Sequence, residues 1–177
     1  MRIGTTKVAI EEYFYQNPTI KLRIRQIERE INVPLPSAIR YAKELEKERK
    51  LQSQVISGIK VYFANRVAKE YLFSKLLFNL KQLRQSGLLD LLIKELNNPV
   101  IIVFGSYSIG EDIETSDIDL YIETVSKKKL NLKNYEIKLQ RKIQLFIFKD
   151  LMIVQSQELR NSIINGFVLN GFLEVFK

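Results

Sequence analysis

The sequence predicts an α+β protein whose elements fall into an N-terminal and a C-terminal half. Three apolar stripes at helical spacing, followed by two strand-like runs joined at Ser57-Gly58, fill residues 6–64. Leucines recur at helical spacing through residues 65–98. Beyond them, the wholly apolar run at 100–104 and the alternating run at 117–123 are typical of buried strands. We therefore expect helices to dominate the first half and a β-sheet to organise the second.

Composition excludes several kinds of chemistry. The chain has 177 residues, enough for one ordinary domain or two small ones. It contains no cysteine, so disulfides and thiolate zinc sites are excluded. It also contains no histidine, which removes the commonest general base and metal ligand. Acid–base or metal chemistry must therefore depend on carboxylates, with Lys, Tyr or Ser in support.

The apolar runs indicate a soluble protein. The first residues, MRIGTTKVAIEEYF, lack the apolar core of a signal peptide. Later apolar runs are interrupted by Lys or Asn before they reach the length that spans a membrane. We expect a cytoplasmic protein without a membrane partner.

The positive charge is concentrated in the first half. The formal net charge is +8, and residues 1–98 hold 18 basic and 10 acidic side chains. Residues 99–177 hold 10 of each. A basic excess on one segment is typical of nucleic-acid-binding proteins, although a solvated lysine-rich surface would give the same counts.

The elements of residues 1–64 follow the order of a winged helix-turn-helix. The first stripe, TKVAIEEYFYQ, stops before Asn17-Pro18, and RIRQIEREI repeats the pattern. The third stripe opens with two prolines and Ser37, which suit a helix start. The two β-prone runs around Ser57-Gly58 then predict a hairpin.

The third stripe, PSAIRYAKELEKERKL, resembles the recognition helix of bacterial and archaeal regulators. The resemblance implies duplex DNA as a partner, because this helix lies in the major groove in such folds. A winged helix used for protein contacts or dimerisation is the alternative. The residues expected at DNA are Ser37, Arg40, Tyr41 and Lys43 of the helix, Lys60 of the hairpin, and Arg23 and Arg25 before the second helix.

Residues 65–98 predict a helical connector between the halves. Leu72, Leu76, Leu80 and Leu83 share one face, and Gly87 marks a break before a second short helix. This connector could also carry the seam of a homodimer.

Two aspartates interrupt the strand-like run SDIDLYIE. Asp117 and Asp119 lie two positions apart and therefore face the same way, while the apolar residues between them face the core. Two carboxylates this close repel each other unless a cation lies between them, and Mg²⁺ suits oxygen ligands. Gly105-Ser106, which follows the preceding strand, can approach and hydrogen-bond a phosphate. Together these four residues predict a site for an Mg–NTP, with ATP as the expected nucleotide.

The same residues resemble a known family. Gly-Ser, ten residues, then Asp, any residue and Asp is the signature of the DNA polymerase β-like nucleotidyltransferases, and VIIVFGSYSIGE…SDIDLYIE resembles their minimal group. The resemblance covers residues 98–150 and implies a mixed-sheet, palm-like nucleotidyltransferase domain at residues 99–177. It implies nucleotide binding by Gly105 and Ser106, and metal binding and catalysis by Asp117 and Asp119. A winged helix joined to such a domain resembles archaeal members of the group.

The chain departs from that family at two positions. Ile109 stands where members carry a basic residue before Gly110. In QRKIQLFIF, Gln144 stands where a later strand carries the third carboxylate, which in the family binds metal and accepts the proton of the attacking hydroxyl. Glu123 or Asp150 could replace that carboxylate. The tail then predicts a packing helix at about 157–165, followed by an extended end.

Three functions follow as expectations. The first is an enzyme that transfers a nucleotidyl group, such as AMP, from Mg–NTP to a hydroxyl acceptor. Relatives that pair with HEPN-domain toxins imply such a toxin as a partner and an antitoxin role. The second is a catalytically degenerate transcriptional regulator that only binds nucleotide or partner, which Gln144 and Ile109 favour. The third is a structural adaptor in a toxin–antitoxin complex.

Overall fold

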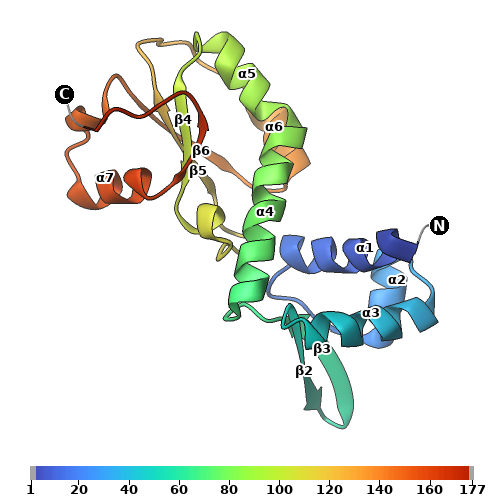
Figure 1. Ribbon diagram of the computed structural model, residues 1–177. Coiled ribbons are helices and arrows are strands. Elements are labelled where there is room, and N and C mark those ends of the chain that lie inside the picture. The colour runs from blue at the N-terminus through green and yellow to red at the C-terminus, as the bar shows by residue number, and fades with distance from the viewer. Residues whose placement is uncertain (1–2, 176–177) are drawn as a thin grey trace. The chain divides into compact units, whose positions relative to one another are not determined.

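The computed structural model describes residues 3–175, which form two compact units. Within these residues, the first unit extends to Phe78 and the second begins at Asn79. The boundary falls inside a single long helix, α4 (Lys69–Ser86). The first part of this helix belongs to the first unit and the remainder to the second. Figure 1 shows the ribbon of both units.

The first unit consists of three helices and a small antiparallel sheet. Its strands lie in the order β1-β3-β2. Ile56 pairs with Ile59, so Ser57 and Gly58 form a two-residue turn, with φ values of 49° and 77°. Two successive positive φ values suit the tight turns that join hairpin strands, and the predicted hairpin is confirmed. The elements are α1 (Ile3–Gln16), β1 (Lys21–Arg23), α2 (Ile24–Ile31), α3 (Leu35–Lys47), β2 (Leu51–Ile56) and β3 (Ile59–Ala64).

The apolar faces of these three helices meet in one core. Ile10 of α1, Ile27 of α2 and Leu45 of α3 are each completely buried there. Helix α3 begins at the prolines, as predicted: Pro34 is its N-cap residue, and Pro36 and Ser37 lie in the first turn. A proline is compatible with this position because the first N–H groups of a helix have no partner within it.

The second unit is built on a four-stranded sheet. Its order is β6-β5-β4-β7, with β5 parallel to β6 and the other pairs antiparallel, so the expected mixed sheet is confirmed. Gly87, with φ 82°, separates α4 from the next helix, as predicted. Besides the end of α4, the elements are α5 (Leu88–Glu95), β4 (Val100–Phe104), the 3₁₀ helix η1 (Ser106–Ile109), β5 (Ile118–Glu123), α6 (Lys133–Leu139), β6 (Ile143–Phe148), the 3₁₀ helix η2 (Leu151–Ile153), α7 (Gln157–Ile164) and β7 (Phe167–Asn170).

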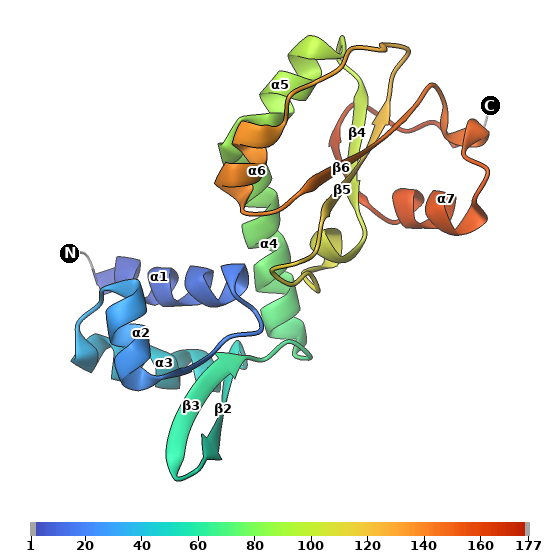
Figure 2. The ribbon, with the colours of Figure 1, turned by 180° about the vertical axis from the view of Figure 1, so that it is seen from behind.

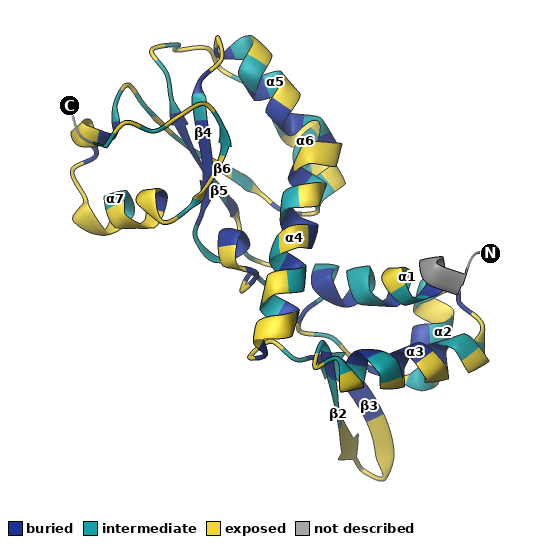
Figure 3. Ribbon diagram, viewed as in Figure 1, coloured by how far each residue is buried: buried dark blue, intermediate teal, exposed yellow. Residues whose placement is uncertain are grey.

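Both faces of this sheet are covered. Figures 1 and 2 show α5 and α6 on one face and α7 on the other. On the first face, Leu120 packs with Leu92 of α5, and on the second, Tyr121 packs with Ile163 of α7. The central strands are therefore buried, as the colours of Figure 3 show.

Candidate functional site

The two aspartates lie at the start of the central strand β5. Asp119 is its second residue, and Asp117 immediately precedes the strand. Asp119 pairs with Phe104, the last residue of β4. The Asp117 side chain is exposed and Asp119 is half-buried. The sheet therefore brings the start of the Asp-x-Asp segment to the point where β4 ends and Gly105 begins.

Gly105 leaves no room for a side chain beside one of these carboxylates. It has φ 71° and ψ −161°, a region that side-chain-bearing residues essentially never adopt. A Cβ added to Gly105 would lie 2.8 Å from Oδ2 of Asp119. Ser106 then opens η1, where its backbone oxygen accepts the N–H of Glu111 at 3.0 Å. The structure thus brings Gly105 close to Asp119, with Ser106 next in the chain and the charge of Asp117 acting on Asp119.

The electrostatics of the pair fit a cation site. Burial raises the pKa of the Asp119 carboxyl above its ordinary value, and the charge of Asp117 raises it further. Both effects disfavour two ionised carboxylates in the free protein. A bound cation would relieve the repulsion that raises this pKa.

Gln144 lies beside Asp119 on the neighbouring strand. Strands β5 and β6 are parallel, and Asp119 and Gln144 are register partners. In a parallel pair, register partners direct their side chains to the same face. The carboxylate that the family resemblance implies at this position is therefore replaced by a neutral amide.

Neither alternative carboxylate lies at that point. Glu123 is at the far end of β5, where it accepts a hydrogen bond of 2.7 Å from the Tyr121 hydroxyl. Asp150 caps η2 and accepts the N–H of Met152 at 2.8 Å. Within residues 3–175, no three carboxylates gather into a possible metal site. Glu123 is thus held by Tyr121, and Asp150 is held by the backbone of η2. Neither hydrogen bond directs a carboxylate toward Asp119.

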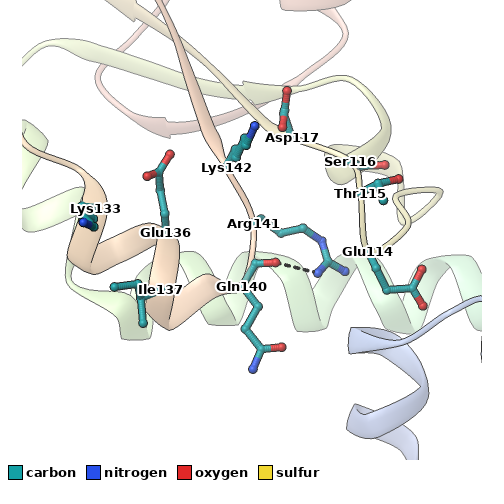
Figure 4. A pocket seen from close by; sticks show the side chains of 10 residues that line it. All are labelled: Glu114, Thr115, Ser116, Asp117, Lys133, Glu136, Ile137, Gln140, Arg141 and Lys142. Atoms are coloured by element: carbon teal, nitrogen blue, oxygen red, sulfur yellow. Dashed lines mark hydrogen bonds between the residues drawn. The ribbon is translucent and has the colours of Figure 1, made fainter.

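An open hollow of about 720 Å³ lies beside Asp117. It is formed by the loop that ends at Asp117, by α6, and by the start of β6 (Figure 4). Lys133, Glu136 and Lys142 line it. Glu136 is held in place because its carboxylate accepts the N–H of Ile143 at 3.0 Å. In Figure 4 the Lys142 side chain lies toward Asp117.

A buried ion pair supports this region. Nη2 of Arg141, two residues before β6, lies 3.6 Å from Oδ2 of Asp112, which is 1% exposed. The other oxygen of Asp112 accepts a hydrogen bond of 2.7 Å from Asn79 of α4. The loop between Gly105 and Asp117 is thereby tied to both α4 and β6. Sequence reasoning missed this pair, because the two residues are distant in the chain and belong to no local pattern.

Most of the basic residues predicted to contact DNA lie on the surface of the first unit. Arg40 and Lys43 of α3 are exposed, and Ser37 is half-buried. Arg23 and Arg25 are exposed at the start of α2. The backbone N–H of Arg23 donates to Oε1 of Gln26 at 2.9 Å, which fixes that end of the helix.

Two of the residues expected at DNA, Tyr41 and Lys60, are engaged within the first unit. Tyr41 is only 5% exposed and packs in the core of the first unit, so its ring is unavailable to DNA. This corrects its inclusion among the DNA contacts: the helical spacing that places Arg40 outside directs the next residue inward. Lys60 of β3 is exposed but lies 3.3 Å from Glu46 of α3. Glu46 thus competes with any phosphate for this lysine.

A comparison with protein families found a match, and it lies within the second unit. Residues 88–167 match the family model described as "Nucleotidyltransferase domain". The second unit is therefore similar to a nucleotidyltransferase domain over these residues. The match supports nucleotidyl transfer as the general class of reaction. It begins at α5 and ends in β7, so it includes all four residues of the candidate site.

Two further comparisons, with curated proteins and with solved structures, found no match to the chain. In the part of the chain that the structure describes, no helix has the length and apolar character needed to cross a membrane.

Proposed function

We propose that Gly105, Ser106, Asp117 and Asp119 bind an Mg–NTP, and that the nucleotidyltransferase domain transfers its nucleotidyl group to a hydroxyl acceptor. The observation that carries this proposal is the close approach of Gly105 to Asp119, where an added Cβ would lie 2.8 Å from the carboxylate. A phosphate beside Gly105 and a cation on Asp119 would thus be neighbours. ATP is the proposed nucleotide.

The residues present suit a magnesium ion. Mg²⁺ is usually held by one or two carboxylates together with substrate phosphates and waters. Asp117 and Asp119 supply the carboxylates, and the repulsion between them falls when a cation binds. When bound, the ion would neutralise charge on the phosphates and make the α-phosphorus a better electrophile.

The remaining steps depend on this chain's own side chains. The Ser106 hydroxyl would donate to a phosphate oxygen, while the absent side chain of Gly105 leaves room for the phosphates. Gln144, beside Asp119, is neutral and cannot accept the proton of the acceptor hydroxyl. The proton must then leave to solvent. Since a general base typically contributes about 10²–10⁴-fold, transfer by the native protein is slow.

A labelling experiment tests this proposal. The native protein, Gln144→Asp and Asp117→Asn are incubated with α-labelled ATP and Mg²⁺, and label on the protein or an added acceptor is followed on a gel. We expect weak labelling by the native protein, more by Gln144→Asp and none by Asp117→Asn. Strong native labelling that Asp117→Asn abolishes would show that the site has another base. Strong labelling that survives Asp117→Asn would place the reaction elsewhere.

A second function is favoured by Gln144 and Ile109. A nucleotidyltransferase domain without a third carboxylate and without a basic residue before Gly110 could bind nucleotide and act only as a regulator. This proposal predicts Mg-dependent ATP binding with no labelling by any of the three proteins. Calorimetry and the labelling gel together separate the two functions.

We also propose that residues 1–64 are a winged helix-turn-helix that binds duplex DNA. Three helices followed by a hairpin, and the exposed Arg40 and Lys43 on α3, support this proposal. Arg40→Ala should weaken binding to a preferred site, while Lys60→Ala should weaken all sequences about equally. The matched control is Lys94→Ala, an exposed lysine of α5. A gel-shift series with no binding at low salt would leave a helix unit used for protein contacts.

A further inference from the structure

Helix α4 has one buried face and one exposed face. Tyr71, Lys75 and Asn79 recur at every fourth position and are buried. Residues three or four positions apart share one face of a helix. On the opposite face every third or fourth residue is exposed, and Figure 3 shows exposed bands along the ribbon of α4. We call this row the outer stripe; its members are Glu70, Phe73, Leu77, Lys81 and Arg84.

The centre of the outer stripe is apolar. Phe73 is 61% exposed and Leu77 is 51% exposed. The exposed face of a helix is usually polar, because only the face toward the core gains by leaving water. Two large apolar side chains one turn apart, with charged residues on both sides, resemble instead the apolar centre and polar rim of a protein interface. The outer stripe is therefore suited to another protein surface rather than to solvent.

The charges of the outer stripe lie symmetrically about Leu77 and are opposite in sign. Glu70 lies seven residues before Leu77, and Arg84 lies seven residues after it. When a second α4 runs antiparallel with Leu77 opposite Leu77, Glu70 of each copy faces Arg84 of the other. Phe73 then faces Lys81, because each is four residues from Leu77. Carboxylate–guanidinium and aromatic–ammonium pairs both attract.

Other partners lack this complementarity. In a parallel pair each residue would face its own copy, so Glu70 would meet Glu70 and Arg84 would meet Arg84, and like charges repel. A polyanion would be attracted at the Arg84 end of the stripe and repelled at the Glu70 end. The order of residues along α4 therefore selects a second copy of this chain, in the antiparallel direction.

Ion pairs within the chain do not prevent this exchange. Oε1 of Glu70 lies 3.4 Å from Nη1 of Arg49, and Nη1 of Arg84 lies 3.6 Å from Oδ1 of Asp90. All four side chains are at least 45% exposed, and ion pairs this exposed contribute little to stability. Glu70 and Arg84 can therefore turn to each other across two copies.

We propose that the outer stripe forms a homodimer, in which α4 of one copy packs antiparallel on α4 of another about a twofold axis at Leu77. A twofold interface uses the same patch on both copies, as this self-complementary stripe does. The 18 residues of α4 extend about 27 Å at ~1.5 Å per residue. A contact between two helices of this length is at the lower end of specific interfaces, so the dimer dissociates on dilution.

Single cysteines can locate the axis, because the chain contains no cysteine of its own. In the antiparallel dimer the two copies of residue 77 meet. The two copies of residue 84 are about 21 Å apart along the helices, at ~1.5 Å per residue, and a disulfide needs Cα atoms within about 7 Å. After oxidation of the full chain, Leu77→Cys should form a covalent dimer on a non-reducing gel, and Arg84→Cys should not.

An equimolar mixture of Glu70→Cys and Arg84→Cys tests the direction of the helices. The antiparallel dimer should link one copy of each variant, and mass spectrometry identifies the linked peptides. Crosslinking of Arg84→Cys alone as fast as that of Leu77→Cys would overturn the antiparallel dimer. The absence of a covalent dimer from both Leu77→Cys and the mixture would also overturn it.

Charge reversal tests the pairing itself. Sedimentation equilibrium at low salt compares the native chain with Glu70→Arg, Arg84→Glu and the double variant. Each single reversal should weaken dimerisation about tenfold, because the twofold axis repeats the lost pair. The double variant should recover the native association. Within one chain it places like charges beside Arg49 and Asp90, so recovery can only come from pairing between copies.

Lys94→Glu, a charge reversal at an exposed lysine of α5, is the matched control and should leave association unchanged. A native chain that stays monomeric at millimolar concentration would overturn the inference. A double variant that associates no better than the single variants would contradict the pairing of Glu70 with Arg84 and overturn it as well. Neither result bears on the proposed nucleotide site, because no residue of the outer stripe belongs to that site.

Discussion

Replacing Gly105 by alanine should disrupt both the backbone and the metal site. The residue has φ 71° and ψ −161°, and a Cβ would lie 2.8 Å from Oδ2 of Asp119. A side chain in such a region costs about 1–3 kcal/mol. The carboxylate must also rotate away, because the backbone at the end of β4 is fixed by the sheet. Asp119 would then lose the orientation that we assign to metal binding.

Gly58→Ala is the matched control for this variant. Gly58 also has a positive φ of 77°, but nothing lies within 4 Å of its added Cβ. It therefore bears only the cost of the left-handed backbone, about 1–2 kcal/mol. Both variants should lower the free energy of unfolding in urea. Calorimetry with Mg–ATP should show binding lost in Gly105→Ala and unchanged in Gly58→Ala. If a folded Gly105→Ala protein bound Mg–ATP with the native affinity, the proposal that the phosphates bind beside Asp119 would be refuted.

Three further variants test the surroundings of the site. Asp119→Asn should raise Tm at pH 7 without Mg²⁺. The free energy of unfolding should increase by about 0.2–1 kcal/mol, as is typical of exposed charge pairs. Because folding raises the pKa of the Asp119 carboxyl, its contribution to stability is present at low pH and is lost as the pH rises through that pKa. The extra stability of Asp119→Asn over the native protein should therefore vanish near pH 3 in thermal melts. Arg141→Met should lower the free energy of unfolding in urea, because it removes a cation 3.6 Å from the buried side chain of Asp112; an unchanged free energy would show that this ion pair does not stabilise the fold. Gln144→Asp should lower Tm without Mg²⁺ and increase the rise in Tm that Mg–ATP produces, and an unchanged Mg²⁺ response would show that residue 144 is remote from the ion.

Local patterns predicted the parts of the protein that depend on neighbours in sequence. The period of two in SDIDLYIE placed Asp117 and Asp119 together, and Ser57-Gly58 predicted its hairpin because turn chemistry is local. Gly87 likewise marked the break between α4 and α5. The register of Gln144 beside Asp119 agrees with the family resemblance, which aligned the same two strands.

Other features depend on tertiary packing and could not be predicted in this way. Strands β7 and β4 pair although most of the sequence of the second unit lies between them. The short run FVLN of β7 shows little periodicity. The pair Asp112–Arg141 joins two loops that meet only in the folded sheet. The burial of Tyr41, by contrast, follows from helical spacing alone, and its place among the expected DNA contacts rests only on the resemblance to a recognition helix.

Mg-dependent nucleotide binding is the most direct test of the central claim that Gly105, Ser106 and the aspartates form one site. ATP is titrated into the native protein, Asp119→Asn and the control Glu123→Gln in a calorimeter, with Mg²⁺ and with EDTA. Glu123 is a suitable control because it lies on the same strand but contacts Tyr121 at the far end. We predict binding by the native protein and by Glu123→Gln only when Mg²⁺ is present, and none by Asp119→Asn. No binding at millimolar ATP, or equal binding by all three proteins, would contradict the account.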